Sequence, residues 1–124
     1  MRHRKLRIAA LAALALLLAA PVQAQTRQVN GLLTTLDGLT LYTFDNDATV
    51  PGKSACAGAC LSMWTPLYAS AGDKAAGDYG FVVRDDGRRQ WTYKGRPLYT
   101  WYNDKKPGDT DGDGLRQAWH VARP

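Results

Sequence analysis

The 124-residue sequence contains no glutamate, and it has only two cysteines and two histidines. One histidine, His3, lies at the N-terminus, and the other is His120. The paired glutamates used in much acid–base catalysis are therefore absent, and no Ser-His-Asp set or phosphate-binding glycine loop can be assembled. An enzyme would have to work with Asp, Tyr, Arg or His120. We therefore expect a protein that is not an enzyme and needs no cofactor.

A long apolar run is absent from the sequence except at its N-terminus. Four basic residues precede an apolar run over residues 8–20, which Pro21 ends before small residues at 22–24. This pattern predicts a secretory signal peptide over residues 1–24, cleaved near Ala24. The run is short for a bilayer span. We expect no transmembrane segment in the mature chain, residues 25–124.

The excess of positive charge belongs mostly to this leader. The whole chain has a formal net charge of +5, and four of its 16 Lys and Arg residues precede residue 25, which leaves 12 against 11 Asp. A nucleic-acid partner would require a basic face that persists in the mature protein. We therefore expect no nucleic-acid partner.

One short sequence motif occurs twice in the mature chain. Residues 41–47 read LYTFDND and residues 98–104 read LYTWYND. The two copies are 57 residues apart, and the same offset aligns Thr35 with Thr92. In a strand, the Tyr and the aromatic residue two positions later share one face, and the Asp follows the strand end, where its carboxylate can cap a turn. A repeat of this length is one supersecondary unit used twice. The motif residues are Tyr42, Phe44, Asp47, Tyr99, Trp101 and Asp104.

Asn-Gly, Asp-Gly and Lys-Gly pairs separate short strand-like segments in each copy, which is typical of hairpins. The fold class predicted is mainly β, with two antiparallel three-strand meanders packed as one small sheet, sandwich or partial barrel. A short helical turn is expected near residues 54–63. The single domain would hold repeats at about 26–68 and 79–122, joined by a connector at 69–78. The strands expected are 26–29, 32–36, 39–44, 79–84, 89–93 and 96–101.

The two cysteines, Cys56 and Cys60, are separated by three residues, not by the two of thioredoxin-like redox sites. In an exported protein they are expected to form a structural disulfide, worth about 2 kcal/mol for so small a loop. A reactive thiol pair is the alternative.

The segment 109–114 reads DTDGDG and matches the first half of a calcium-binding loop, with carboxylates at Asp109, Asp111 and Asp113. The second half does not match, because His120 stands where a bidentate Glu belongs. Bound calcium and a plain Asp-rich turn both remain open.

Aromatic residues are numerous for a domain of this size. They can replace missing Leu and Ile in a thin β core. Alternatively, an exposed aromatic groove formed by Trp64, Trp91 and Trp119 would bind a glycan, a peptide or a flat cofactor.

Taken with the stretches PGKSACAGACLSMWTPL and DGRRQWTYKGRPLYTWYND, the two motifs resemble the bacterial secreted-repeat proteins, a predicted lipoprotein family with a Yx(FWY)xxD motif. The resemblance covers nearly all of the mature chain and implies export. It places the motif Tyr and Asp at Tyr42 with Asp47 and at Tyr99 with Asp104, without assigning them a role. Ala24 is followed by Gln and not by the lipid-bearing Cys of a lipoprotein, so we expect a periplasmic or secreted protein without a lipid anchor.

These observations predict an exported, non-enzymatic envelope protein, a disulfide-pinned repeat module with a structural or binding role. Its partner would be an unknown envelope component or a small ligand. One alternative is a calcium- or metal-binding module that uses the Asp-rich loop. Another is a periplasmic thiol-redox or electron-transfer accessory protein that uses the Cys pair.

Overall fold

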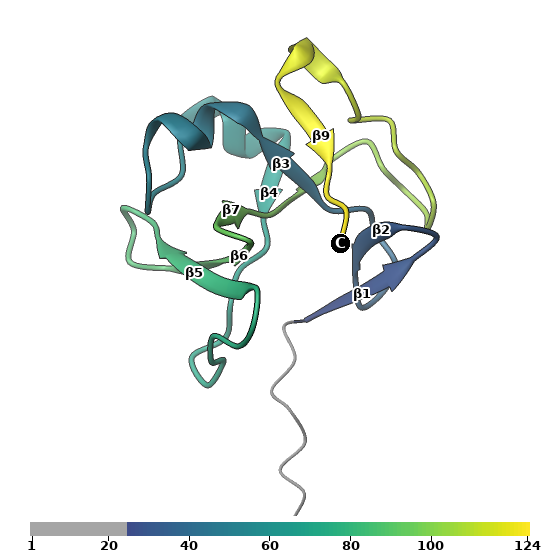
Figure 1. The fold of residues 1–124 in the computed structure, drawn as a ribbon. Coiled ribbons are helices and arrows are strands. Elements are labelled where there is room, and N and C mark those ends of the chain that lie inside the picture. The colour runs from purple at the N-terminus through teal and green to yellow at the C-terminus, as the bar shows by residue number, and fades with distance from the viewer. Residues whose placement is uncertain (1–24) are drawn as a thin grey trace, which may run out of the picture.

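The structure, a computed structural model, describes residues 25–124, and the expected signal peptide lies outside the described residues. Within this range the protein has β-strands and three short 3-10 helices but no α-helix. The prediction of a mainly β fold is confirmed (Figure 1). No helix of residues 25–124 has the length and apolar character needed to cross a bilayer.

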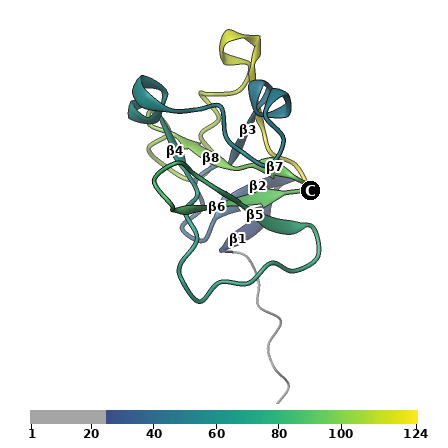
Figure 2. The ribbon, with the colours of Figure 1, turned by 90° about the vertical axis from the view of Figure 1, so that its left-hand side faces the viewer.

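The first repeat contributes four strands and the second contributes five. They are β1 (Thr26–Val29), β2 (Leu32–Thr35), β3 (Tyr42–Phe44), β4 (Trp64–Pro66), β5 (Tyr79–Val83), β6 (Arg89–Tyr93), β7 (Arg96–Pro97), β8 (Tyr99–Trp101) and β9 (Trp119–Val121). The 3-10 helices are η1 (Asp45–Thr49), η2 (Gly58–Ser62) and η3 (Leu115–Gln117). All three lie at one end of the molecule (Figures 1 and 2).

Two of the four expected Xaa-Gly turns form tight two-residue hairpins. Asn30 and Gly31 join β1 to β2, and Lys94 and Gly95 join β6 to β7. All four residues have positive φ, between 48° and 80°. Type I′ turns require this backbone, because it matches the twist of the flanking strands. At Asp37-Gly38 and Asp86-Gly87 the aspartate does not have positive φ, and each of these turns has three residues.

The turn after β2 is one residue longer than its counterpart after β6. As a result Thr34, which bridges Thr40, occupies the position of Thr92, which pairs with Pro97. The aligned offset of 57 therefore holds after the turn but not before it. Thr35 is not the structural equivalent of Thr92, because the extra residue shifts β2 by one position.

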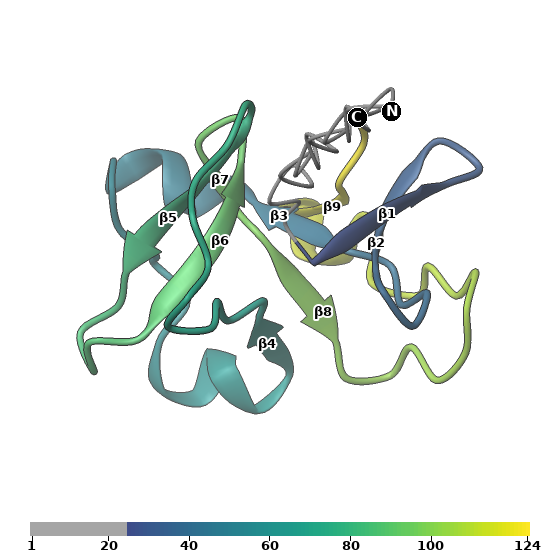
Figure 3. The ribbon, with the colours of Figure 1, turned by 90° about the horizontal axis from the view of Figure 1, so that it is seen from below.

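The strands form three small antiparallel sheets and no closed barrel. Their orders are β1-β2, β4-β8-β3-β9 and β5-β6-β7. The first and the third flank the central four-stranded sheet on opposite sides (Figures 1 and 3). The two meanders thus remain separate at their outer strands and combine only at the centre.

In the central sheet, each repeat supplies an edge strand that pairs with an inner strand of the other repeat. β4 of the first repeat pairs with β8 of the second, with Trp64 opposite Trp101. β9 of the second repeat pairs with β3 of the first, with Trp119 opposite Phe44. The two inner strands meet at one pair, Tyr42 opposite Tyr99. The repeats are therefore intertwined about a local pseudo-two-fold axis between these strands.

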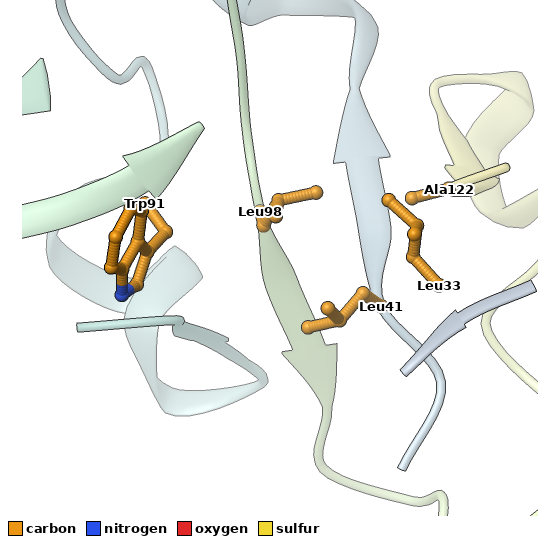
Figure 4. Close-up of a cluster of buried hydrophobic side chains, with 5 residues drawn as sticks. All are labelled: Leu33, Leu41, Trp91, Leu98 and Ala122. Carbon is orange, nitrogen blue, oxygen red and sulfur yellow. The ribbon is translucent and has the colours of Figure 1, made fainter. Parts of the chain in front are cut away.

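Two clusters of buried side chains lie on opposite faces of the inner strands, because successive residues of a strand point to opposite sides. Leu41 and Leu98 point into one cluster, and Tyr42 and Tyr99 point into the other. The first cluster comprises Leu33, Leu41, Trp91, Leu98 and Ala122 (Figure 4). The second comprises Tyr42, Cys56, Trp64, Tyr99 and Trp119.

The exchange of strands predicts that the two halves stay together after the connector is cut. A protease site inserted after the exposed Lys74 would give fragments 25–74 and 75–124. We expect them to co-elute in gel filtration with unchanged near-ultraviolet circular dichroism, because each fragment supplies an edge strand to the other's sheet. The disulfide joins Cys56 to Cys60 within one fragment and cannot hold the two together. Separate elution without denaturant would contradict the exchanged arrangement.

Candidate functional site

Two buried tyrosine–aspartate hydrogen bonds cross between the repeats. Tyr42 Oη donates to Asp104 Oδ2 at 2.6 Å, and Tyr99 Oη donates to Asp47 Oδ2 at 2.8 Å. All four side chains are buried. Each motif tyrosine therefore binds the motif aspartate of the other copy. Nothing in the sequence reveals this crossing, because the motif places each Tyr near its own Asp along the chain.

The second carboxylate oxygen of each aspartate closes a loop. Asp47 Oδ1 accepts the Ala55 N–H at 2.6 Å, and Asp104 Oδ1 accepts the Asp111 N–H at 3.0 Å. Both aspartates thus accept a backbone hydrogen bond in the loop that follows their own strand, as their position in the motif predicts. Each carboxylate ties its own loop to the tyrosine of the other repeat.

Each tyrosine oxygen has one further neighbour, and the two neighbours differ chemically. The Ser54 hydroxyl hydrogen-bonds to Tyr99 Oη, and the Gly112 N–H donates to Tyr42 Oη at 3.2 Å. Because a backbone amide holds the equivalent place in the other copy, Ser54 serves as a structural donor. Its contact with a Tyr–Asp pair is not the arrangement of an activated nucleophile.

Gly112 is required by close packing. A Cβ at this position would lie 2.7 Å from Trp64 Cη2 and 3.1 Å from Tyr42 Cε1. Only glycine lets the backbone come near enough to donate to Tyr42. In the sequence this residue is explained equally well as part of a turn, so its role was not predicted.

Burial sets the protonation of the crossed pairs. Loss of solvation raises the pKa of Tyr42 and that of Tyr99 far above the usual value of a phenol, and the adjacent carboxylates raise both further. Burial also raises the pKa of Asp47, against the opposing effects of the Ala55 N–H, the Tyr99 hydroxyl and the charge of Arg84. The two phenols are therefore neutral hydrogen-bond donors and cannot serve as bases.

The structure gathers a different carboxylate set from the predicted Asp109, Asp111 and Asp113. Oxygens of Asp104, Asp109 and Asp111 lie within 4.8 Å of one another. Asp113 instead accepts the Val121 N–H at 3.1 Å. The buried Asp104 thus takes the place that Asp113 holds in the sequence pattern, because the loop folds back over the motif.

Cys56 and Cys60 form the predicted disulfide, with Cα atoms 5.4 Å apart. Cys56 is fully buried, and Arg84 links its carbonyl oxygen to Gln90. His120, the one histidine of the described residues, contacts Asp45 with 2.9 Å between Nε2 and Oδ2 on an exposed surface. It does not reach the crossed pairs.

Four aromatic rings stack across the pseudo-two-fold axis. Phe44 stacks on Trp119 at 4.1 Å, Trp119 on Trp64 at 3.6 Å, and Trp64 meets Trp101 at 4.4 Å between ring centroids. Trp64 and Trp119 are nearly parallel, at 2°. Trp91, expected beside them, lies fully buried in the other cluster and does not line a groove.

An open groove of about 690 Å³ runs beside this stack. It lies among the 3-10 helices, and its walls are largely apolar. Apart from the tryptophan indoles, its polar or charged lining side chains are Asn46 and Arg116. Asn46 lies within the repeated segment 41–47 but is not one of the motif residues, and Arg116 lies outside both copies. The lining residues are Phe44, Asn46, Ala59, Cys60, Met63, Trp64, Trp101, Leu115, Arg116, Ala118 and Trp119.

Comparison with protein families gives one match that covers most of the chain. A family described as "Secreted repeat of unknown function" matches residues 25–67 and again residues 80–123. A search of the curated proteins and a search of the solved structures each found no match. The family match falls on both copies of the motif.

Removing one member of a crossed pair is expected to destabilise the protein. Asp47→Ala or Asp104→Ala leaves a buried tyrosine hydroxyl and a backbone N–H without their acceptor, which costs about 1–3 kcal/mol for each group. Thermal and urea unfolding measure the loss, with the exposed Asp78→Ala as control. Unchanged melting temperatures in both variants would contradict a structural role for the motif.

The raised pKa of Asp47 predicts an unusual dependence of stability on pH. The folded protein holds this proton more tightly than the unfolded chain, so the stability that Asp47 contributes is present at low pH. It is lost as pH rises from the ordinary Asp pKa, about 4, through the folded value. The unfolding free energy of the wild type minus that of Asp47→Asn should therefore decrease between pH 3.5 and 7. Urea unfolding of both proteins measures this difference, and an increase would contradict it.

Proposed function

The chain belongs to the family of secreted repeats, and from this membership and the groove we propose that it is an exported, non-enzymatic binding module of the cell envelope. Its disulfide and its crossed Tyr–Asp pairs hold the two repeats as one scaffold for the groove. The signal peptide cleaved near Ala24, the absence of a lipid anchor and a periplasmic or secreted location are parts of this proposal.

The use of the buried polar groups supports a non-enzymatic role. Both oxygens of Asp47 and both oxygens of Asp104 accept hydrogen bonds within the protein. The tyrosines are held neutral by burial. A general base or nucleophile needs a lone pair that faces a substrate, whereas these carboxylates accept tyrosine O–H and backbone N–H groups of the protein.

The groove is the observation that carries the binding role. Small-molecule sites are mostly apolar clefts of about 300–1,000 Å³ with a few polar groups, and the groove matches that description. Trp64 and Trp119 are nearly buried, whereas Phe44 and Trp101 at the ends of the stack are partly exposed. Rings held in such a stack give a rigid wall that loses little entropy when a ligand binds.

Calcium binding by Asp104, Asp109 and Asp111 is the second candidate function, favoured by the approach of their carboxylate oxygens. These oxygens also accept backbone N–H groups, with Asp109 Oδ2 bound by Lys105 and Lys106. A cation would have to compete with those bonds. Calorimetric titration with calcium chloride tests this candidate independently of the groove. The thiol-redox alternative rests on the Cys56–Cys60 bond alone.

The neutral dye N-phenyl-1-naphthylamine, which fluoresces in apolar sites, is expected to bind the groove with one-to-one stoichiometry. Ala59 is exposed and lines the groove, so Ala59→Phe should obstruct it and weaken binding at least about tenfold, or 1.4 kcal/mol. Val83→Phe adds a Phe at an exposed position outside the groove and serves as the matched control. Equal binding by both variants would contradict groove binding, provided that both melt as the wild type does.

A further inference from the structure

We propose that the groove selects a planar aromatic small molecule carrying one anionic group, whose charge pairs with Arg116 and whose rings lie against the partly exposed rings of Phe44 and Trp101. This inference rests on the proposed binding function and names its ligand class. Three features of the groove lead to it: its symmetry, its charge and its size.

Most of the groove is built from pairs of residues related by the pseudo-two-fold axis. Backbone bonds establish the equivalence: Tyr102 donates to the carbonyl of Met63 at 2.9 Å, as Asp45 does to that of Ala118 at 2.8 Å. The equivalent pairs that line the groove are Phe44 with Trp101, Trp64 with Trp119, Cys60 with Leu115, and Met63 with Ala118. These pairs are apolar and give the groove an uncharged surface.

The polar groups break this symmetry. Arg116 corresponds to Leu61 in the first repeat, which packs against the core and does not line the groove. Arg116 and its neighbour Gln117 have left-handed backbone, with φ of 51° and 52°, which Leu61 and Ser62 do not. Non-glycine residues adopt this backbone at an energetic cost. A partly buried apolar position of the first repeat is therefore a charged position at the groove in the second.

Arg116 is the one charged residue among those lining the groove. Within residues 25–124, its guanidinium takes part in none of the side-chain hydrogen bonds or ion pairs of the structure. The other polar lining residue, Asn46, follows β3, and Arg116 precedes β9, which pairs with β3. Asp45 is engaged by His120. One side of the groove thus presents an unpaired cation and an amide, which suit a carboxylate, sulfonate or phosphate.

Size favours a small molecule over a macromolecule. A volume of about 690 Å³ accommodates a ligand of two or three fused or linked rings. A stable protein partner typically covers about 800 Å² on each side, far more than this groove offers. A planar ligand can lie along the partly exposed Phe44 and Trp101, while its anion reaches Arg116.

Two dyes that share one ring system separate the parts of this proposal. 8-Anilinonaphthalene-1-sulfonate carries a sulfonate, and N-phenyl-1-naphthylamine is its neutral parent. We expect Arg116→Gln to weaken binding of the sulfonate at least about fivefold and to leave the neutral dye unchanged, because only the sulfonate loses an ion pair. Added salt should weaken the sulfonate alone. Arg116→Lys should retain most of the sulfonate's affinity.

The control is Lys74→Gln, which removes the same charge at an exposed position outside the groove and should affect neither dye. Melting curves and near-ultraviolet circular dichroism establish that each variant is folded. If Arg116→Gln weakens both dyes equally, or neither, the role of Arg116 is wrong. If the neutral dye still binds and Ala59→Phe blocks it, the proposed function stands without this inference. If neither dye binds the wild type, both proposals fail.

Discussion

The reciprocal hydrogen bonds of Tyr42 with Asp104 and of Tyr99 with Asp47 are the constraint on which the rest of the structure depends. A buried carboxylate is costly unless it is hydrogen-bonded, and each one here is held by a tyrosine of the other repeat and a backbone amide of its own loop. Neither repeat can satisfy its aspartate alone. The same polar groups that stabilise the core therefore make the two repeats inseparable.

Strand exchange also holds the two repeats together. β4 and β9 each complete the inner strand of the other copy, and they bring Trp64 and Trp119 face to face on the axis. A single meander of three short strands buries little apolar surface and is marginal by itself. Two exchanged copies bury a continuous aromatic cluster. The Cys56–Cys60 disulfide then restrains the one long loop of the first repeat that passes over Tyr99.

Duplication also explains the distribution of charge in the groove. Symmetric pairs build the floor and walls of the groove, and they carry no charge. Differences between the copies supply the polarity: Arg116 replaces the partly buried Leu61, and the second loop is rich in aspartate where the first holds a disulfide. The asymmetric anionic ligand that we propose would use such a difference, because its single charge needs a cation at only one end of the groove.

The sequence by itself determined the β class, two of the four hairpin turns, the disulfide and the family, because positive-φ residue pairs, cysteine spacing and the Tyr-x-aromatic-x-x-Asp motif act over a few residues. Only the tertiary structure decided which tyrosine meets which aspartate, that Trp91 lies apart from Trp64 and Trp119, and that Asp104 replaces Asp113 near Asp109. The Tyr–Asp pairing depends on how the two copies exchange strands, and the approach of Asp104 to Asp109 depends on how the second loop folds back over the motif. Contacts across 50 to 70 residues leave no local pattern, since within-repeat and exchanged pairing bury the same side chains on the same strand faces.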